Sequence, residues 1–245
     1  MADAKTEGGV GVSQFRYVYG VADCRQGPPS DLGLGVEGAP VEVVQAGHLG
    51  VLSSAIDREA AIPGRSEALA HERVLKRAMR QRTVLPVAFG SITGDSLTAF
   101  LQSIESRALT LCDQLAGKVE VGLKIFWLPQ ALRQELVSEG ALPAEDSPQP
   151  AMAVEQAVAD RVEQWRRTHA REAVDSLRPL AVDYRENPVI SVQMLLNAAF
   201  LVNAGQLLAI EARVDALDRH YADRLYLKLT TGLPPCSFVD LRLAL

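Results

Sequence analysis

The sequence is poor in the residues that build covalent or metal-held frameworks. Its 245 residues include three cysteines, Cys24, Cys112 and Cys236, which lie far apart and form no CxxC spacing. An odd number of widely separated thiols excludes a readable disulfide framework or zinc knuckle. We interpret all three as buried or idle thiols in a reducing cytoplasm.

Motifs for catalysis and cofactor binding are also missing. The chain has no GxxxxGK[ST], HExxH or GxSxG motif, and its four histidines share no i,i+4 spacing. One stretch, Gly33–Gly38, matches GxGxxG, but Pro28 and Pro29 precede it and the strand-like residues 41–44 follow it. Dinucleotide binding needs a strand before the glycines and a helix N-terminus after them. We therefore expect a flexible loop here, and no catalytic residues, cofactor or metal site in the chain.

Long apolar runs are scarce. The longest, Val192–Val202, is interrupted by Gln193 and Asn197 and is far shorter than the roughly 18 residues that cross a membrane. The N-terminal residues lack the apolar core of a signal peptide. We therefore expect a cytoplasmic protein without a membrane partner.

Clustered positive charge is scarce as well. The formal net charge is −5, and one basic cluster, Lys76, Arg77, Arg80 and Arg82, lies on a predicted helix without interleaved aromatic residues. Nucleic acids are bound by clustered Lys and Arg, usually with aromatic residues between them for single strands. We interpret the cluster as a solvated helix face and expect no nucleic-acid partner.

The remaining pattern predicts an α+β protein with a first domain over 15–138, preceded by a disordered tail over 1–14. Phe15, Tyr17, Tyr19 and Val21 alternate, which predicts a strand over 15–22 with these side chains on one face. The other elements expected in this domain are strands over 41–46, 49–55, 83–90 and 118–128, and helices over 66–81, 95–117 and 129–138.

Residues 139–151 are predicted to be a domain linker, because they contain three prolines and three acidic residues between periodic segments. A second domain is expected over 152–245. It would contain a long charged helix over 152–177, a strand over 189–196, a helix over 207–221 and a strand over 224–230. After this last strand, residues 237–245 alternate, which predicts a strand with Val239 facing the core and Phe238 facing outward.

Five segments stand out in order through residues 15–239: Tyr17–Val21 (YVYGV), Val84–Gly90 (VLPVAFG), Gly117–Lys124 (GKVEVGLK), Asn197–Val202 (NAAFLV) and Leu229–Val239 (LTTGLPPCSFV). Together they resemble one known family, the gas vesicle GvpF/GvpL proteins. The chain departs from the family pattern in the last segment. It has the single Leu233 where two residues are expected, and Cys236 in place of a tyrosine.

The resemblance implies a ferredoxin-like N-terminal domain and an α+β C-terminal domain with long helices. It also implies a non-enzymatic accessory or minor structural role in gas vesicle assembly, located in the cytoplasm and at the gas vesicle. The expected partners are the small, apolar shell subunit and other vesicle accessory proteins. We predict the partner-binding residues in the closing motif: Leu233, Pro234, Pro235, Cys236 and Phe238.

One alternative stays open at this point. Ferredoxin-like domains also occur in ligand-binding regulatory proteins, and a fold does not fix a function. A sensor would be distinguished from an assembly factor by a ligand-induced rise in melting temperature.

Overall fold

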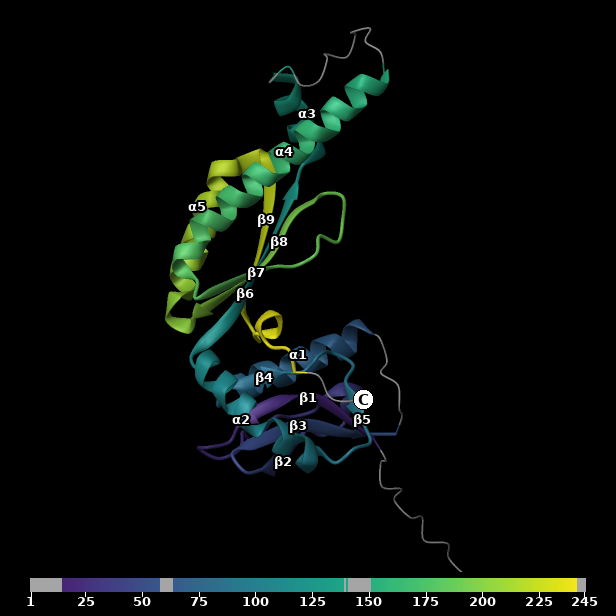
Figure 1. The fold of residues 1–245 in the computed structure, drawn as a ribbon, viewed down its shortest axis with the longest axis vertical. Coiled ribbons are helices and arrows are strands. Elements are labelled where there is room, and N and C mark those ends of the chain that lie inside the picture. The colour runs from purple at the N-terminus through teal and green to yellow at the C-terminus, as the bar shows by residue number, and fades with distance from the viewer. Residues whose placement is uncertain (1–14, 58–63, 139, 141–150, 242–245) are drawn as a thin grey trace, which may run out of the picture. The chain divides into compact units, whose positions relative to one another are not determined.

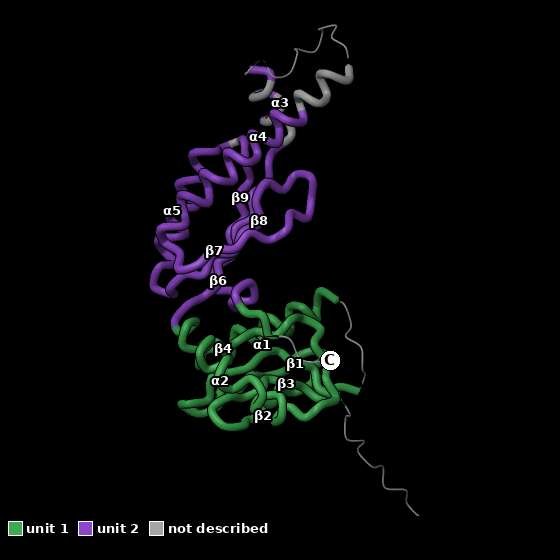
Figure 2. The backbone as a smooth tube through the Cα atoms, viewed as in Figure 1, with its two compact units in different colours: residues 1–116, 239–245 green, residues 117–238 purple. Residues whose placement is uncertain are grey.

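The structure, a computed structural model, describes residues 15–57, 64–138, 140 and 151–241. The chain forms two compact units (Figures 1 and 2). Unit 1 comprises residues 1–116 and 239–245, and unit 2 comprises residues 117–238. The predicted tail over 1–14 lies outside the described residues.

Unit 1 contains an antiparallel sheet and two helices. The strands are β1 (Phe15–Asp23), β2 (Glu42–Ala46), β3 (Leu49–Ile56), β4 (Val84–Pro86) and β5 (Ile92–Thr93), and the helices are α1 (Arg65–Met79) and α2 (Leu97–Leu115). The strand order is β2-β3-β1-β4, with β5 also paired to β1. Pro86 therefore lies on an edge strand, as its missing N–H predicts.

The alternation of β1 is interrupted by an irregularity in its pairing with β3. The register shifts between Val18 and Gly20, so that Tyr19 is the extra residue of a bulge. Tyr17 and Tyr19 both pack in the core under α1, but Val21 is buried outside that cluster. The expectation that Val21 shares their face is wrong, because the extra residue reverses the faces beyond it.

Two buried tyrosines organise the core beneath α1. The Tyr17 hydroxyl lies 2.9 Å from Nδ1 of His71 and accepts from the backbone N–H of Gly90 at 3.0 Å. The Tyr19 hydroxyl accepts from the Val36 N–H at 2.8 Å. Burial raises the pKa of Tyr17 to about 12 and lowers the pKa of His71 to about 4. The family segment Val84–Gly90 is thus held in place by β1 side chains.

The described residues of unit 2 form four antiparallel strands and three α-helices. The strands are β6 (Lys118–Trp127), β7 (Asp183–Glu186), β8 (Met194–Asn203) and β9 (Leu225–Leu233), and the helices are α3 (Pro129–Ser138), α4 (Ala151–Leu177) and α5 (Leu207–Tyr221). The strand order is β7-β8-β6-β9. Because α3 and α4 lie between β6 and β7, and α5 lies between β8 and β9, the unit has the β-α-β-β-α-β arrangement of a ferredoxin-like fold.

The predicted α+β class is confirmed, with both sheets antiparallel. The ferredoxin-like strand order expected of the N-terminal domain is present in unit 1, whose order β2-β3-β1-β4 matches β7-β8-β6-β9 of unit 2, with a loop in place of the first helix. The two units divide at a different place from the expected domains because of β6, which was predicted to close the first domain. It pairs with β8 and β9 along its length, and these pairings draw residues 117–138 into unit 2. The predicted linker falls within unit 2, and its residues 139 and 141–150 lie outside the described residues.

One face of the unit 2 sheet is covered by helices. Val121, Leu123 and Ile125 of β6 pack with Trp165 of α4 and Ile210 of α5 in a single core cluster. Side chains at alternate positions of a strand point to opposite faces, so the residues between these three point away from the helices.

A candidate protein-interaction surface

The closing motif forms a short turn after β9, which we call the C-terminal turn (Leu233–Phe238). Gly232 lies just before the turn, where the register of β9 with β6 shifts, and its φ of 64° is readily adopted by glycine. Pro234 and Pro235 are buried, Leu233 and Phe238 are half-buried, and Cys236 is exposed. The structure therefore brings the five predicted residues together in one turn, in which the two prolines are buried and the other three side chains are at least partly exposed.

A buried carboxylate anchors this turn to the sheet. Glu120 of β6 accepts from the Ser237 backbone N–H at 2.8 Å and from its hydroxyl at 2.9 Å. Glu120 is 7% exposed, and burial raises the pKa of its carboxyl despite these two hydrogen bonds, which oppose the shift. Hydrogen bonds to a carboxylate are stronger than neutral ones, so this pair fixes the position of the turn.

Phe238 lies under a guanidinium group. The Arg185 Cζ atom of β7 sits 5.7 Å from the centre of the Phe238 ring, within the range of a cation–π contact. The predicted strand over 237–245 is wrong for its described part, because residues 236–238 form a 3-10 turn. Val239 and Phe238 are both half-buried, so they do not divide into a core residue and an outward residue, and residues 242–245 lie outside the described residues.

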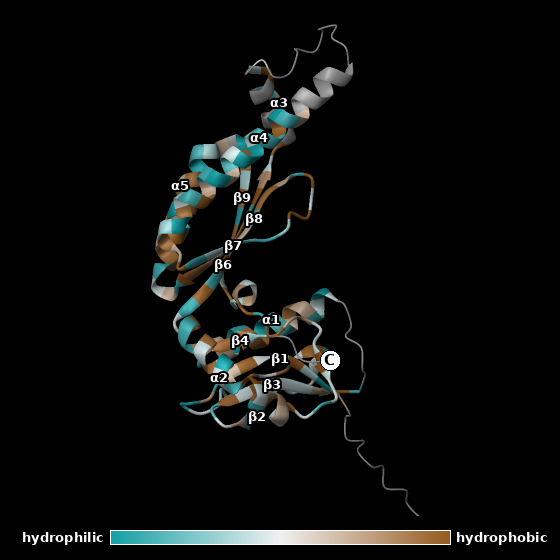
Figure 3. Cartoon of the chain, in the orientation of Figure 1, coloured by the Kyte–Doolittle hydropathy of each residue, from teal (hydrophilic) through white to brown (hydrophobic). Residues whose placement is uncertain are grey.

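A second accessible surface is the β7–β8 loop (residues 187–193). Its aliphatic side chains Val189, Ile190 and Val192 are 49%, 72% and 82% exposed, and brown stretches mark the loop beside β8 in Figure 3. The sequence predicted a strand over 189–196, but β8 begins at Met194. Val189, Ile190 and Val192, which the sequence predicted to begin a strand, are thus exposed to solvent in a loop. A period-2 pattern alone does not reveal this difference.

The backbone of this loop is tied to the sheet at both ends. Asn197 Nδ2 donates to the Pro188 carbonyl at 2.8 Å, and the Asn187 N–H donates to the Asn197 carbonyl at 2.7 Å. Near the other end, Trp127 Nε1 donates to the Val192 carbonyl at 3.0 Å. The exposed aliphatic side chains are therefore presented on a fixed backbone, which lowers the entropy lost when a partner binds.

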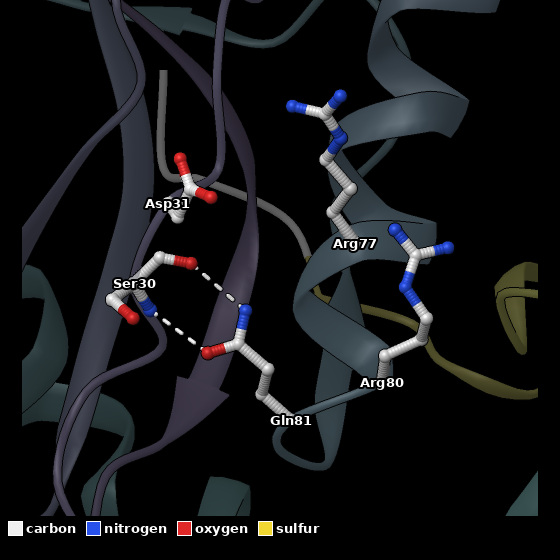
Figure 4. Close-up of a pocket in the computed structure, with 5 residues that line it drawn as sticks. All are labelled: Ser30, Asp31, Arg77, Arg80 and Gln81. Carbon is white, nitrogen blue, oxygen red and sulfur yellow. Dashed lines mark hydrogen bonds between the residues drawn. The ribbon is translucent and has the colours of Figure 1, made fainter.

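Unit 1 contains a polar pocket of about 520 Å³ lined by Ser30, Asp31, Arg77, Arg80 and Gln81 (Figure 4). Gln81 bonds to Ser30 twice, accepting from its N–H at 3.0 Å and donating to its carbonyl at 2.8 Å. Arg77 donates to the Leu32 carbonyl at 3.3 Å. The end of α1 thus fastens the loop that precedes β2.

The predicted solvated basic face is accordingly only part of the basic cluster. Arg82 donates to the Gly27 and Gln26 carbonyls at 2.7 and 2.6 Å, so it also holds the loop. Lys76 pairs with Glu72 one helical turn away, as a solvated residue does. The carbonyls that Arg77 and Arg82 bind lie about 45 to 55 residues earlier in the chain, and that separation hides their role from the sequence.

The Gly33–Gly38 segment uses its amides internally. Gly35 N–H donates to the Ala39 carbonyl at 2.8 Å, Gly38 N–H donates to the Gly35 carbonyl at 3.3 Å, and Val36 N–H is taken by Tyr19. A phosphate cradle presents free amides at the start of a helix. The three-residue 3-10 turn Val36–Gly38 follows here instead, so the segment lacks the geometry of a dinucleotide loop.

Two other kinds of site are absent from the residues that the structure describes. In that part of the chain no three His, Cys, Asp or Glu side chains gather to ligate a metal ion. Nor does any described helix combine the length and apolar character needed to cross a bilayer.

Comparison with known proteins identifies relatives along the whole described chain. The family model described as gas vesicle synthesis protein GvpL/GvpF matches residues 15–240. Gas vesicle protein F of Nostoc sp. (strain PCC 7120 / SAG 25.82 / UTEX 2576) is 27% identical over 208 residues, which cover 78% of this chain and 84% of that protein. Gas vesicle protein F of Streptomyces sp. (strain CB03234) is 29% identical over 240 residues, covering 91% and 99%.

Solved structures agree with the sequence relatives. The crystal structure of GvpF from Microcystis aeruginosa superposes with a TM-score of 0.75 at 25% identity and covers 93% of this chain and 99% of that one. GvpF from Anabaena sp. PCC7120 gives a TM-score of 0.77 at 22% identity, covering 93% and 97%. The family model spans both units and the closing turn, and the chain therefore belongs to the gas vesicle GvpL/GvpF family.

Proposed function

We propose that this protein is a non-enzymatic accessory factor that binds the small shell subunit, together with other vesicle proteins, while the gas vesicle is assembled. It would act in the cytoplasm and at the growing vesicle. The observation that carries the proposal is the β7–β8 loop, which exposes three aliphatic side chains on a backbone hydrogen-bonded to the sheet.

Exposed apolar side chains that gather in one place mark contact surfaces in soluble proteins. A loop with this composition would normally turn its aliphatic residues inward, because burying each of them is worth about 1.5–3 kcal/mol. In this loop they remain exposed although hydrogen bonds fix the backbone on both sides. An apolar shell subunit is a partner that would bury them, and holding that subunit would also protect it from aggregation.

The C-terminal turn is proposed as a second part of the same contact. Leu233, Cys236 and Phe238 would meet the partner, and Pro234 and Pro235 would keep the turn rigid. The anchoring of Ser237 by Glu120 supports this division of roles, since a turn held by a buried carboxylate presents its neighbours in one arrangement.

The sensor alternative rests on the pocket beside Arg77 and Arg80 in unit 1. The residues that line it already bond to the loop before β2, which favours a structural role for them. The two functions differ in thermal unfolding. A sensor would melt at a higher temperature with its ligand, whereas we expect nucleotides and divalent ions to leave the melting temperature unchanged.

The experiment is capture of purified shell subunit by the immobilised full chain. The double variant Ile190→Ser/Val192→Ser should lose most of the capture and keep its melting temperature, because exposed side chains contribute within about 0.5 kcal/mol to stability. Leu208→Ser is the matched control, since Leu208 is 79% exposed on α5 away from the loop. Equal capture by the double variant and the wild type would exclude the loop as the contact.

The turn is tested in the same assay with Phe238→Ala. At temperatures where it is folded, this variant should capture less shell subunit than the wild type. Arg185→Ala removes the cation above the ring and keeps the ring itself, so it should capture as much as the wild type. Normal capture by Phe238→Ala would remove the turn from the proposed contact and leave the loop to stand alone.

A further inference from the structure

The face of the unit 2 sheet that points away from α4 and α5 carries an ordered group of basic and aromatic side chains. On β6, Leu123 and Ile125 are in the core beneath the helices, so Lys124 and Phe126 point to the opposite face. On β9, Leu227 and Leu229 pack against the same core, so Lys228 and its neighbour Tyr226 also point to the opposite face. We call these four residues, Lys124, Phe126, Tyr226 and Lys228, the open face.

The four side chains form two direct cross-strand pairs. Lys124 lies opposite Lys228 and Phe126 lies opposite Tyr226, with no shift in register between the two pairs. The rings of Phe126 and Tyr226 are 6.0 Å apart and tilted by 32°. Tyr226 is 55% exposed, and Lys228 is exposed while Lys124 is half-buried. A cationic pair therefore stands beside an aromatic pair on an accessible surface.

The charge of this face is unbalanced within the described chain. Like charges placed directly opposite each other in a sheet are destabilising, and among the described residues neither lysine forms an ion pair. The one carboxylate that β6 and β9 place on this side is Glu120, which is buried and bonded to Ser237. No carboxylate on β6 or β9 therefore offsets the repulsion between Lys124 and Lys228.

The β7–β8 loop borders this face. Asn197 of β8 is the direct partner of Lys124, and its side chain donates to the Pro188 carbonyl of the loop. The loop that carries Ile190 and Val192 is therefore joined to the sheet beside Lys124. A ligand that covers the two lysines and the aromatic pair would have the aliphatic side chains of this loop nearby.

We infer that the open face binds an acidic, amphipathic segment of a protein partner, with carboxylates at Lys124 and Lys228 and apolar side chains against Tyr226 and the β7–β8 loop. The inference rests on the proposed use of that loop and adds the charge of the bound segment. A nucleic acid fits less well, because two lysines are few for a phosphate backbone and the chain carries a net charge of −5. Complementary charge across the contact would set its specificity and its rate of formation.

The test uses fluorescence anisotropy of a short labelled peptide with glutamate and leucine at helical spacing, added to the full chain. Lys124→Glu/Lys228→Glu should weaken peptide binding by about tenfold or more, and added salt should weaken binding to the wild type. The matched control is Arg167→Glu/Arg171→Glu, which changes the net charge equally on α4, where the two side chains are 79% and 84% exposed. The control should bind the peptide like the wild type, and a lysine–leucine peptide should not bind.

Absence of binding to the wild type, or equal weakening in both double variants, would overturn the inference. Displacement of the peptide by a single-stranded oligonucleotide at matched charge concentration would overturn it in favour of a nucleic-acid site. The proposed function fails separately: if the shell subunit is not captured while the peptide binds as expected, the open face stands and its partner is another protein.

Discussion

The Tyr17 hydroxyl lies 2.9 Å from His71 Nδ1 in the core of unit 1 and also accepts the Gly90 N–H. These contacts join β1, α1 and the family segment Val84–Gly90. Burial is the main cause that lowers the pKa of His71 from 6.5 to about 4, so the ring is neutral at physiological pH. A neutral ring can accept the tyrosine proton at one nitrogen, and protonation would place an unpaired charge in this core.

Unit 1 should lose stability as the pH falls from 6.5 towards 4. A histidine with a depressed pKa binds protons more readily in the unfolded chain, so its contribution is complete above 6.5 and disappears as the pH falls through about 4. The full shift corresponds to at most about 3 kcal/mol. Chemical denaturation followed by circular dichroism at several pH values should show this slope, and His71→Gln should flatten it.

The tryptophans give this experiment an internal control. Both Trp127 and Trp165 lie in unit 2, so tryptophan fluorescence reports the unfolding of unit 2 alone. That transition should respond equally to pH in the wild type and in His71→Gln. His220→Gln, which changes an exposed histidine on α5, should leave the circular dichroism slope intact. A slope that survives in His71→Gln would contradict the assignment.

Ser237→Ala should destabilise unit 2 by about 1–2 kcal/mol, because a buried carboxylate then loses one of its two hydrogen bonds. Denaturation monitored by tryptophan fluorescence measures the loss. Ser191→Ala, in the exposed β7–β8 loop, is the control and should stay within about 0.5 kcal/mol of the wild type. If the two variants were equally stable, the anchor between Glu120 and Ser237 would contribute nothing.

Lys228→Glu should stabilise unit 2 by about 0.5 kcal/mol, since it replaces a like-charge cross-strand pair with an opposite-charge pair. Lys228→Gln, which only removes the repulsion, should give a smaller gain, and salt should reduce both. The same fluorescence transition reports the change. A loss of stability in Lys228→Glu would mean that the repulsion between the two lysines is absent in the free protein.

Residues 139–151 should be the first site of limited proteolysis, because three prolines and three acidic residues make such a segment accessible. The cut would fall inside unit 2, so the two fragments should separate on a denaturing gel and elute together on native gel filtration. Pairing of β6 with β8 and β9 would hold them together. Fragments that separate without denaturant, or first cuts elsewhere, would contradict this expectation.

Much of the fold follows from local patterns in the sequence. The stripe that includes Leu97, Leu101 and Ala108 predicted α2, and the alternation in Lys118–Trp127 predicted β6, because each period is written in adjacent residues. The bulge at Tyr19 escaped detection, since an extra residue on one strand is defined only by its partner strand. The boundary between the units was not visible for the same reason, as the partners of β6 lie about 70 to 115 residues later.

The candidate surfaces, like the fold, could be predicted from the sequence only in part. The family segment drew attention to Leu233 and Phe238, but the anchor that positions them joins Glu120 and Ser237, which are 117 residues apart. Ile190 and Val192 look like strand residues in the sequence, and only the start of β8 at Met194 leaves them exposed. Lys124 and Lys228 were each visible near the end of a predicted strand, but their pairing required the register.

The division of unit 1 into residues 1–116 and 239–245 sets an order on synthesis. Leu241 is buried, and Arg107 of α2 donates to the Asp240 carbonyl at 3.4 Å, so the late segment is part of the structure of unit 1. A ribosome adds about 5–20 residues per second, so the nascent first unit waits on the order of 10 s while residues 117–238 are made. During that interval the core of unit 1 lacks the segment that carries Leu241. A cellular chaperone then has its longest opportunity to bind the chain.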